Sequence, residues 1–536
     1  MKLAFTIVAL LFAISAISQE PYVSKVWVAD NGDGTYKNPI LHADYSDPDA
    51  IRVGDDYYMI ASSFDQVPGL PILHSKDLVN WSILGYALKR QPPYDHFSTT
   101  QHGNGVWAPS IRYHNKEFYI YYPNPDFGIY LTKAKDIDGP WSDPQLVEAG
   151  KGLIDPCPLW DDDGKVYLVH AFAGSRAGIK SIIVIRKMNA EGTRTIDDGV
   201  LVYDGHELDP TIEGPKLYKR NNFYYIFAPA GGVSTGWQLV LRSKNIYGPY
   251  ERRVVMAQGT SNVNGPHQGA WVTTQTGEDW FLHFQDKDAY GRVVHLQPIT
   301  WFRDWPIIGD VVKDQLYGQP VSVFKKPNVG KQYSVTTPIE SDEFNSIQMG
   351  LQWQWQANPN ATWSFMTGSS LRLYTQQIPD SAKNLWDVPN VLMQKFPAEE
   401  FTVTAKCKFN PRIDEEKFSF IVMGSDYAGF AVLKKLQGTY LMYELCKAAD
   451  KGSNASLTVE KQISAGLELY LRVKVKQGAA CSFSFSYDGN EFTEVSETFI
   501  AKPGRWIGAK FGFSCTRTTK TNDSGYADID WIRIEK

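Results

Sequence analysis

GDDYYMIAS, at residues 54–62, is the first of five stretches in which a polar turn leads into a run of aromatic and apolar residues. The stretches recur roughly every 50 to 60 residues, close to the period of propeller blades that each hold several strands. We therefore predict an all-β protein whose residues 35–322 form a five-bladed β-propeller. The other four stretches are NKEFYIYYP (115–123), DGKVYLVHA (163–171), NNFYYIFAP (221–229) and GEDWFLHFQ (277–285).

A second domain is expected after the propeller. The chain has 536 residues, more than the roughly 250 to 300 that one hydrophobic core usually serves. A segment rich in Lys, Pro and Gly at 325–331 interrupts the repeats, as a linker does. Beyond it, runs such as EFTVTAKCKF (400–409) and LYLRVKVKQ (469–477) alternate in the manner of strands in packed antiparallel sheets. Residues 338–536 are thus predicted to form a jelly-roll or concanavalin-like β-sandwich.

The first 18 residues have the pattern of a cleavable signal peptide. Lys2 is followed by an apolar run and by the small-residue site Ala16-Ile17-Ser18. No cysteine follows this site for lipid attachment, and no later run is long and apolar enough for membrane insertion. We expect a secreted or periplasmic protein. A net charge of -5 without blocks of like charge argues against a nucleic-acid partner.

Three carboxylates stand in Pro-bounded turns in register with the repeat. Asp47 lies in YSDPD, Asp155 in LIDP and Glu213 in TIEGP. A proline favours an extended conformation in the residue before it, which would fix the direction of these side chains. Singly, each is more easily an ordinary turn. Together they resemble the acid and base that cleavage of a glycosidic bond requires.

These and further motifs identify the chain as similar to glycoside hydrolase family 43. The resemblance covers nearly all of the chain after the signal peptide, and its motifs occur in the family's order. The tail resembles the sandwich domain of xylosidase-type members. The motifs are NPI (38–40), SDPDAIRVGDDYY (46–58), PGLPILHSKDLVNW (68–81), GVWAP (105–109), IDP (154–156), EGP (213–215) and LQWQW (351–355).

The resemblance implies a role for each carboxylate. Asp47 would be the general base that activates water, Glu213 the general acid, and Asp155 the group that tunes the pKa of the acid and helps to orient the sugar. The family inverts configuration, which places base and acid about 6.5 to 9.5 Å apart. The substrate would be a plant oligosaccharide or polysaccharide, and no cofactor is required.

Four further residues are candidates for binding sugar. The resemblance assigns Phe64 and Trp107 to the walls of the pocket and Arg292 to sugar hydroxyls, whereas the alternatives are core aromatics and a surface salt bridge. His267 would lie near the central channel, where some relatives hold calcium or sodium through water. Its alternative role is a hydrogen-bonded core residue.

The resemblance leaves the sugar open. We favour an exo-acting α-L-arabinofuranosidase on arabinoxylan or xyloglucan fragments, because residues 64–67 read FDQV and lack an acidic-aromatic pair associated with xylosidases. The alternatives are a β-D-xylosidase or a bifunctional enzyme. A non-catalytic carbohydrate-binding protein is a remote alternative, because it predicts the loss of an essential carboxylate and all three are present.

Overall fold

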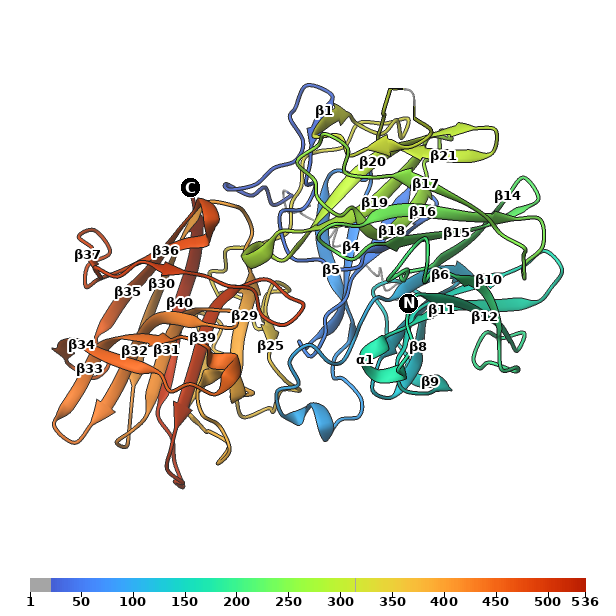
Figure 1. Cartoon of the computed structure of the whole chain (residues 1–536). Coiled ribbons are helices and arrows are strands. Elements are labelled where there is room, and N and C mark those ends of the chain that lie inside the picture. Colours follow the sequence, from blue (N-terminus) through green and yellow to red (C-terminus); the bar gives the residue numbers. More distant parts are fainter. Residues whose placement is uncertain (1–20, 314) are drawn as a thin grey trace, which may run out of the picture.

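The structure is a computed structural model that describes residues 21–313 and 315–536. It consists of two β domains that lie side by side, with the propeller coloured blue to yellow and the sandwich orange to red (Figure 1). The predicted signal peptide at 1–18 lies outside the described residues. In the described part of the chain, no helix combines the length and the apolar character needed to cross a membrane.

Five antiparallel sheets form the blades of the propeller. The first strand of each blade contacts the first strand of a neighbouring blade around the axis, as for β2 and β6 or β6 and β10. The blades are β2–β5, β6–β9, β10–β13, β14–β17 and β18–β21. Their strands are Asp49–Val53, Asp56–Ile60, Gly69–Ser75, Trp81–Leu88; Ser110–His114, Glu117–Asn124, Gly128–Ala134, Gln145–Ala149; Leu153–Trp160, Val166–Phe172, Ile182–Met188, Val200–Asp204; Lys216–Arg220, Phe223–Ala230, Trp237–Ser243, Glu251–Met256; and His267–Thr273, Asp279–Asp286, Arg292–Phe302, Trp305–Ile308.

The five aromatic stretches become the second strand of each blade, namely β3, β7, β11, β15 and β19. Each of these strands pairs with a strand on either side. Its two faces pack against the two neighbouring blades, as the opposite faces of β7 do in two separate cores. In β7, seven of the eight residues are buried. Burial on both faces favours continuous aromatic and β-branched runs over strict alternation, which explains the repeat in the sequence.

The N-terminal segment fastens the first blade to the last. Strand β1 (Thr35–Lys37) pairs with β24 (Val323–Lys325). Asn38 donates from Nδ2 to the carbonyl oxygens of Leu296 and Val321, at 2.8 and 2.9 Å. These bonds join residues far apart in the sequence and close the ring. The described chain also contains the short pair β22 (Asp310–Val311) and β23 (Gly318–Gln319), which extends the fourth blade.

The second domain is a sandwich of two antiparallel-rich sheets. One follows the order β25-β29-β39-β31-β32-β33-β34, and the other β26-β27-β40-β30-β35-β36-β37. Their facing sides enclose a core of Phe, Val, Ile and Leu side chains. The strands are Gln354–Trp355, Val391–Lys395, Lys510–Arg517, Lys417–Met423, Tyr427–Lys435, Gly438–Cys446, Ser456–Ile463; and Ser364–Met366, Leu371–Tyr374, Tyr526–Glu535, Phe401–Asn410, Glu468–Lys476, Ala480–Ser486, Thr493–Glu494, with β28 (Gln376–Gln377) and β38 (Phe499–Ile500) at the sides.

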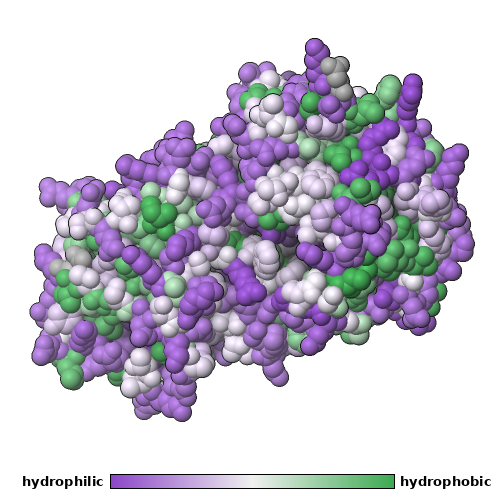
Figure 2. All heavy atoms as spheres, viewed as in Figure 1, coloured by the Kyte–Doolittle hydropathy of each residue, from purple (hydrophilic) through white to green (hydrophobic). Residues whose placement is uncertain are grey.

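This architecture confirms the predicted fold class, a five-bladed propeller followed by a concanavalin-like sandwich. Helical structure in the described chain is limited to single turns, such as α1 (Gly174–Ala177). The face in Figure 2 is mainly polar, with apolar residues gathered in small areas. Most buried apolar residues therefore lie in the separate cores of the propeller and the sandwich.

The two domains are joined by direct backbone pairing. Val67, in the first blade, forms a β-bridge with Trp355 of the sandwich, and their amides and carbonyls bond reciprocally at 3.0 and 2.6 Å. Asn358 adds bonds to the backbone of Gln91 at 2.7 and 2.9 Å. The sandwich is thus fixed against the rim of blade one, next to the segment that contains Phe64.

Candidate active site

All seven residues predicted from the sequence line one pocket. Five of them lie at, or a few residues before, the first strands of the blades, whereas Phe64 lies in the loop between β3 and β4 and Arg292 begins β20. The pocket therefore lies at one end of the propeller axis. The lining residues are Asp47, Phe64, Trp107, Ala108, Ile154, Asp155, Glu213, Val233, His267, Gln268, Arg292 and Trp506.

Asp47 lies two residues before β2 and is surrounded by hydrogen-bond donors. Its Oδ2 accepts bonds from the hydroxyls of Ser46 and Ser62, at 2.6 and 2.5 Å. Arg292 Nη1 lies 3.3 Å from Oδ1. The Asp47 side chain is 8% exposed. Hydrogen bonds to an ionised acceptor are stronger than bonds between neutral groups, so this arrangement stabilises a carboxylate at a fixed position.

Asp155 lies inside β10 and is 3% exposed. Its Oδ2 accepts a bond from the backbone amide of Gly214 at 2.7 Å, which ties it to the turn that contains Glu213. Burial raises the pKa of Asp155 to about 7, and the nearby charges of Glu213 and then Asp47 contribute in the same direction. The third and fourth blades therefore bring two interacting carboxyl groups into one site.

Glu213 precedes β14 and is the most exposed of the three carboxylates, with 34% of its side chain accessible. Its backbone amide bonds to the carbonyl of Pro229 at 3.1 Å. His267 Nε2 lies 3.4 Å from Glu213 Oε1. The side chain of Glu213 is therefore accessible from the pocket while β15 holds its backbone. Its carboxyl group can reach a substrate oxygen without movement of the main chain.

The expected extended conformation before proline is wrong for both aspartates. Asp47 has a φ of 54° and Asp155 a φ of 58°, in the left-handed region. Phe64 has a φ of 52° and is strained in the same way. Non-glycine residues occupy this region rarely, and such strain gathers at functional sites. The bonds of Asp47 to two serine hydroxyls and of Asp155 to Gly214 hold conformations that the local sequence disfavours.

Arg292 begins β20 and is 7% exposed, so the surface salt bridge expected as its alternative is not what the structure shows. Its Nη1 donates to Ser46 Oγ at 2.7 Å. Its guanidinium lies 4.9 Å from the centre of the Phe284 ring and 5.6 Å from that of Trp506. A rigid fork of donors held between aromatic rings is suited to bind hydroxyl oxygens.

Trp107 forms a wall of the pocket and is only partly buried. Its Nε1 donates to the carbonyl of Gly103 at 2.9 Å, and the guanidinium of Arg176 lies 5.4 Å from the ring centre. Phe64, which is 3% exposed, pairs through its backbone with Val106. Both aromatics therefore line the pocket, and Trp107 also packs against the core that blades three and four share.

Trp506 is a pocket residue that sequence reasoning missed. It belongs to a loop of the sandwich, GRWIG at 504–508, and lies 6.1 Å from the ring of Trp107. The loop is fastened by Gly508 and Ala509, whose amides donate to Asp44 Oδ2 at 2.9 Å and to the carbonyl of Ala289 at 2.7 Å. The available sequence signal for this residue was a tryptophan in a turn bounded by glycines. Its contact with the propeller joins residues far apart in the chain, so the local sequence does not predict it.

The surroundings of His267 do not fit direct binding of a metal ion. Both ring nitrogens lack a hydrogen-bond partner among the described residues, and the residue is 1% exposed. Calcium prefers six to eight oxygen ligands. Within residues 21–313 and 315–536, no three His, Cys, Asp or Glu side chains gather as a metal site would require. An ion held through water stays a prediction.

Family models match both domains. Residues 36–306 match the model described as glycosyl hydrolases family 43. The chain belongs to this family. Residues 341–535 match the model described as the beta xylosidase C-terminal concanavalin A-like domain. The family 43 assignment makes the chain a glycoside hydrolase and the pocket with three carboxylates its candidate active site.

Relatives of this family 43 enzyme are named either as beta-xylosidases or as an arabinofuranosidase. A putative beta-xylosidase from Xylanibacter ruminicola is 37% identical, over 91% of this chain and 88% of the relative. A beta-xylosidase from Formosa agariphila is 33% identical, over 94% and 91%. A non-reducing end alpha-L-arabinofuranosidase from Bacteroides ovatus is 31% identical, over 73% and 74%. A family 43 protein from Bacillus licheniformis has the same fold, with a TM-score of 0.81 at 24% identity over 94% and 99% of the two chains.

The raised pKa of Asp155 predicts a pH-dependent stability difference. The folded-state pKa, about 7, exceeds the value of about 3.9 typical of unfolded chains. Ionisation as the pH rises from about 4 to about 7 therefore favours unfolding of the wild type. Asp155→Asn should gain free energy of unfolding relative to the wild type across this window, by up to about 4 kcal/mol. Denaturant titrations at intervals between pH 4 and pH 8 check this, and a difference that stays constant would contradict it.

Trp506→Ala tests the contribution of the sandwich to the pocket. The side chain is 45% exposed, so its loss should leave the melting temperature nearly unchanged. Loss of an aromatic wall should lower kcat/KM about tenfold, mainly through KM. Steady-state kinetics and a thermal melt give both quantities. Phe302→Ala is the matched control, because Phe302 is 48% exposed and does not line this pocket. Equal effects of the two variants would remove Trp506 from the site.

Proposed function

We propose that the enzyme is an exo-acting β-D-xylosidase that releases terminal xylose from xylo-oligosaccharides. The observation that carries this is a pocket with three carboxylates, one side of which is supplied by Trp506 of a beta-xylosidase-type sandwich domain. A wall across one side favours binding of one terminal sugar over binding of a continuous chain. The two relatives named as beta-xylosidases are also more similar to the chain than the one named as an arabinofuranosidase.

This proposal reverses the order of our sequence-based preference. The absence of an acidic-aromatic pair at residues 64–67 favoured α-L-arabinofuranosidase. In the structure, Phe64 is the one residue of this segment that lines the pocket, whereas Asp65 accepts the amide of Gln101 at Oδ2, at 3.1 Å. The identity of residue 65 therefore carries little information on the sugar. Arabinofuranosidase stays the second candidate, supported by the relative from Bacteroides ovatus.

In the proposed mechanism, Asp47 accepts the proton of the attacking water. Ser46, Ser62 and Arg292 hold its carboxylate, so the group need not reorganise as the reaction proceeds. The water oxygen forms a bond to the anomeric carbon from one face of the sugar. The bond from this carbon to the leaving oxygen breaks on the other face, which inverts the configuration.

Glu213 donates its proton to the leaving oxygen in the same step. It opens to the pocket, and its backbone is bonded to Pro229. Asp155 lies next to this acid, and the repulsion between two like charges favours states in which the pair retains one proton. We assign Asp155 to this supporting role. Arg292, Phe64 and Trp107 would position the sugar.

Two amide variants separate the base from the acid. Asp47→Asn should lower kcat about 10² to 10⁴-fold on xylobiose and on an aryl β-D-xyloside alike. Glu213→Gln should lower it by a similar factor on xylobiose, but much less on the aryl xyloside, because a good leaving group needs little protonation. Thermal melts confirm that both variants fold. If the aryl substrate rescued Asp47→Asn instead, the two roles would have to be exchanged.

The preference for the sugar is measured with two aryl glycosides. We expect kcat/KM for the aryl β-D-xyloside to exceed that for the aryl α-L-arabinofuranoside at least tenfold, a difference of about 1.4 kcal/mol. A ratio below one would establish the arabinofuranosidase alternative. Asp47→Asn is the control. If this variant loses the xylosidase and the arabinofuranosidase activity by the same factor, both reactions take place in one pocket. Binding of either sugar without hydrolysis would support the non-catalytic alternative.

A further inference from the structure

A short helix of the third blade carries a side chain that reaches the pocket wall in the second blade. Helix α1 lies between β11 and β12, next to β8 of the neighbouring blade (Figure 1). Ala173, just before the helix, donates its amide to the carbonyl of Gly152 at 2.8 Å. A Cβ on Gly152 would lie 2.6 Å from the backbone nitrogen of Ala177. The position of the α1 backbone is therefore set by the turn that leads into β10 and Asp155.

Arg176 is the residue of α1 that crosses from blade three to blade two. Its Nη2 donates to Asn104 Oδ1 at 2.7 Å, and its Nε donates to Asp126 Oδ1 at 3.2 Å. Asn104 lies directly before the motif GVWAP, and Asp126 lies in the turn between β7 and β8. The Arg176 side chain is 17% exposed. One guanidinium therefore joins two loops of blade two from a fixed position in blade three.

The same guanidinium lies over the ring of Trp107. Its central carbon is 5.4 Å from the ring centre, within the distance of about 6 Å over which an aromatic face attracts a cation. At its other contact, the indole Nε1 donates to the carbonyl of Gly103 at 2.9 Å. A bond at the nitrogen alone leaves the ring free to tilt about that bond. The cation over the ring is the second contact, and the two together fix the plane of Trp107.

Arginine is suited to this position by its shape. Its guanidinium is planar, always charged, and offers five N–H donors in a rigid fork. Arg176 uses this fork for an amide oxygen, a carboxylate and the hydroxyl of Ser175, the last at 2.9 Å, while it lies over the indole. A lysine ammonium is a compact charge on a flexible stem, so it would not hold all these contacts in one geometry.

We propose that Arg176 is a positioning residue for the sugar, which acts by fixing the plane of the Trp107 ring. This inference rests on the proposed function, in which Trp107 forms a wall against the terminal sugar. A ring already held in one orientation can pack against the C–H groups of a sugar without a further loss of freedom on binding. Arg176 itself is not one of the described residues that line the pocket. It therefore acts through Trp107, on binding of the sugar more than on bond cleavage.

Steady-state kinetics on xylobiose and on an aryl β-D-xyloside test this role in the full-length enzyme. Arg176→Met keeps an unbranched stem and removes the charge and the donors. It should raise KM about tenfold and change kcat less than about twofold, because the lost binding is shared by the ground state and the transition state. Arg176→Lys should give a KM between those of Arg176→Met and the wild type, since it restores the charge without the fork. A fall in kcat with an unchanged KM would overturn the proposal.

A double-mutant cycle with Trp107→Leu shows whether Arg176 acts through the ring. Leucine keeps apolar volume against the neighbouring core but has no ring. In the Trp107→Leu background, Arg176→Met should change KM less than about twofold, because the group on which Arg176 acts is absent. The same increase in both backgrounds would overturn the proposal. Thermal melts confirm that each variant folds.

Arg242→Met is the matched control. The Arg242 side chain is 12% exposed, pairs with Glu251 at 2.7 Å and lies 4.2 Å from the ring centre of Trp305, but it does not line the pocket. This variant should have the KM of the wild type even if its melting temperature falls. An equal rise in KM in both arginine variants would overturn the proposal. Hydrolysis by the wild type is measured in the same assays, so that result would leave the proposed xylosidase activity standing.

Discussion

The carboxylate of Asp44 connects three of the segments that form the active site. Its Oδ1 accepts the backbone amide of Arg292 at 2.9 Å, and its Oδ2 accepts that of Gly508 at 2.9 Å. Asp44 thus ties the segment before Asp47 to blade five and to the sandwich loop that carries Trp506. Space is so limited that a Cβ on Gly291 would lie 2.5 Å from the Asp44 carboxyl carbon. Glycine is required there by this close approach.

A buried lysine supports the same junction from the sandwich. Lys510 begins β39, is 2% exposed and donates from Nζ to Gln66 Oε1 at 2.9 Å. Gln66 in turn donates to Asp65 Oδ1 at 3.0 Å. Burial, and then the charge of Lys395, lower the pKa of Lys510 to about 7. Burial of this amine costs free energy, but Lys510 thereby fixes the segment next to Phe64. The sandwich therefore supports the active site as well as contributing Trp506 to it.

The sequence was informative wherever structure depends on neighbouring residues. The aromatic repeats predicted the propeller because each blade reuses one local pattern, and turn motifs at the blade starts predicted a common site for Asp47, Asp155 and Glu213. Strand β39 was not predicted, because its buried residues include Lys510, Ser514 and Thr516, and polar residues at buried positions hide the apolar pattern of a strand. The left-handed backbone conformation of Asp47 could not be predicted from the sequence either. It is held by contacts with Ser62 and Arg292, which form only in the folded chain. Trp506 reaches the pocket through contacts with residues more than 200 positions earlier, such as Asp44.

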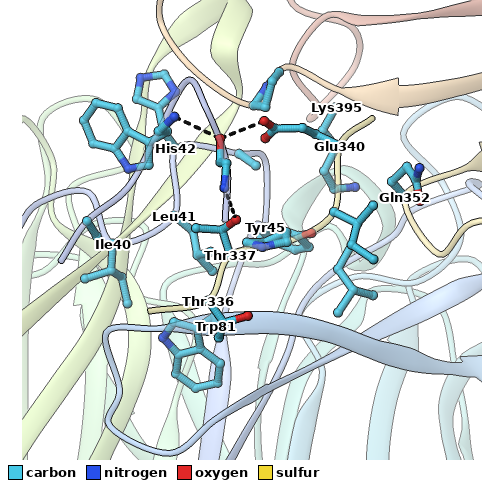
Figure 3. Close-up of a pocket in the computed structure, with 18 of the residues that line it drawn as sticks. Ile40, Leu41, His42, Tyr45, Trp81, Thr336, Thr337, Glu340, Gln352 and Lys395 are labelled. Carbon is cyan, nitrogen blue, oxygen red and sulfur yellow. Dashed lines mark hydrogen bonds between the residues drawn. The ribbon is translucent and has the colours of Figure 1, made fainter. Parts of the chain in front are cut away.

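The segment from His42 to Asp47 is shared by two cavities. His42 and Tyr45 line an interdomain cavity (Figure 3), Asp44 bonds to Arg292, and Asp47 lines the active-site pocket. Asp44, within this run, also accepts the amide of Gly508 from the sandwich. One short segment therefore contributes to the interdomain cavity, to the active-site pocket and to the contact between the domains.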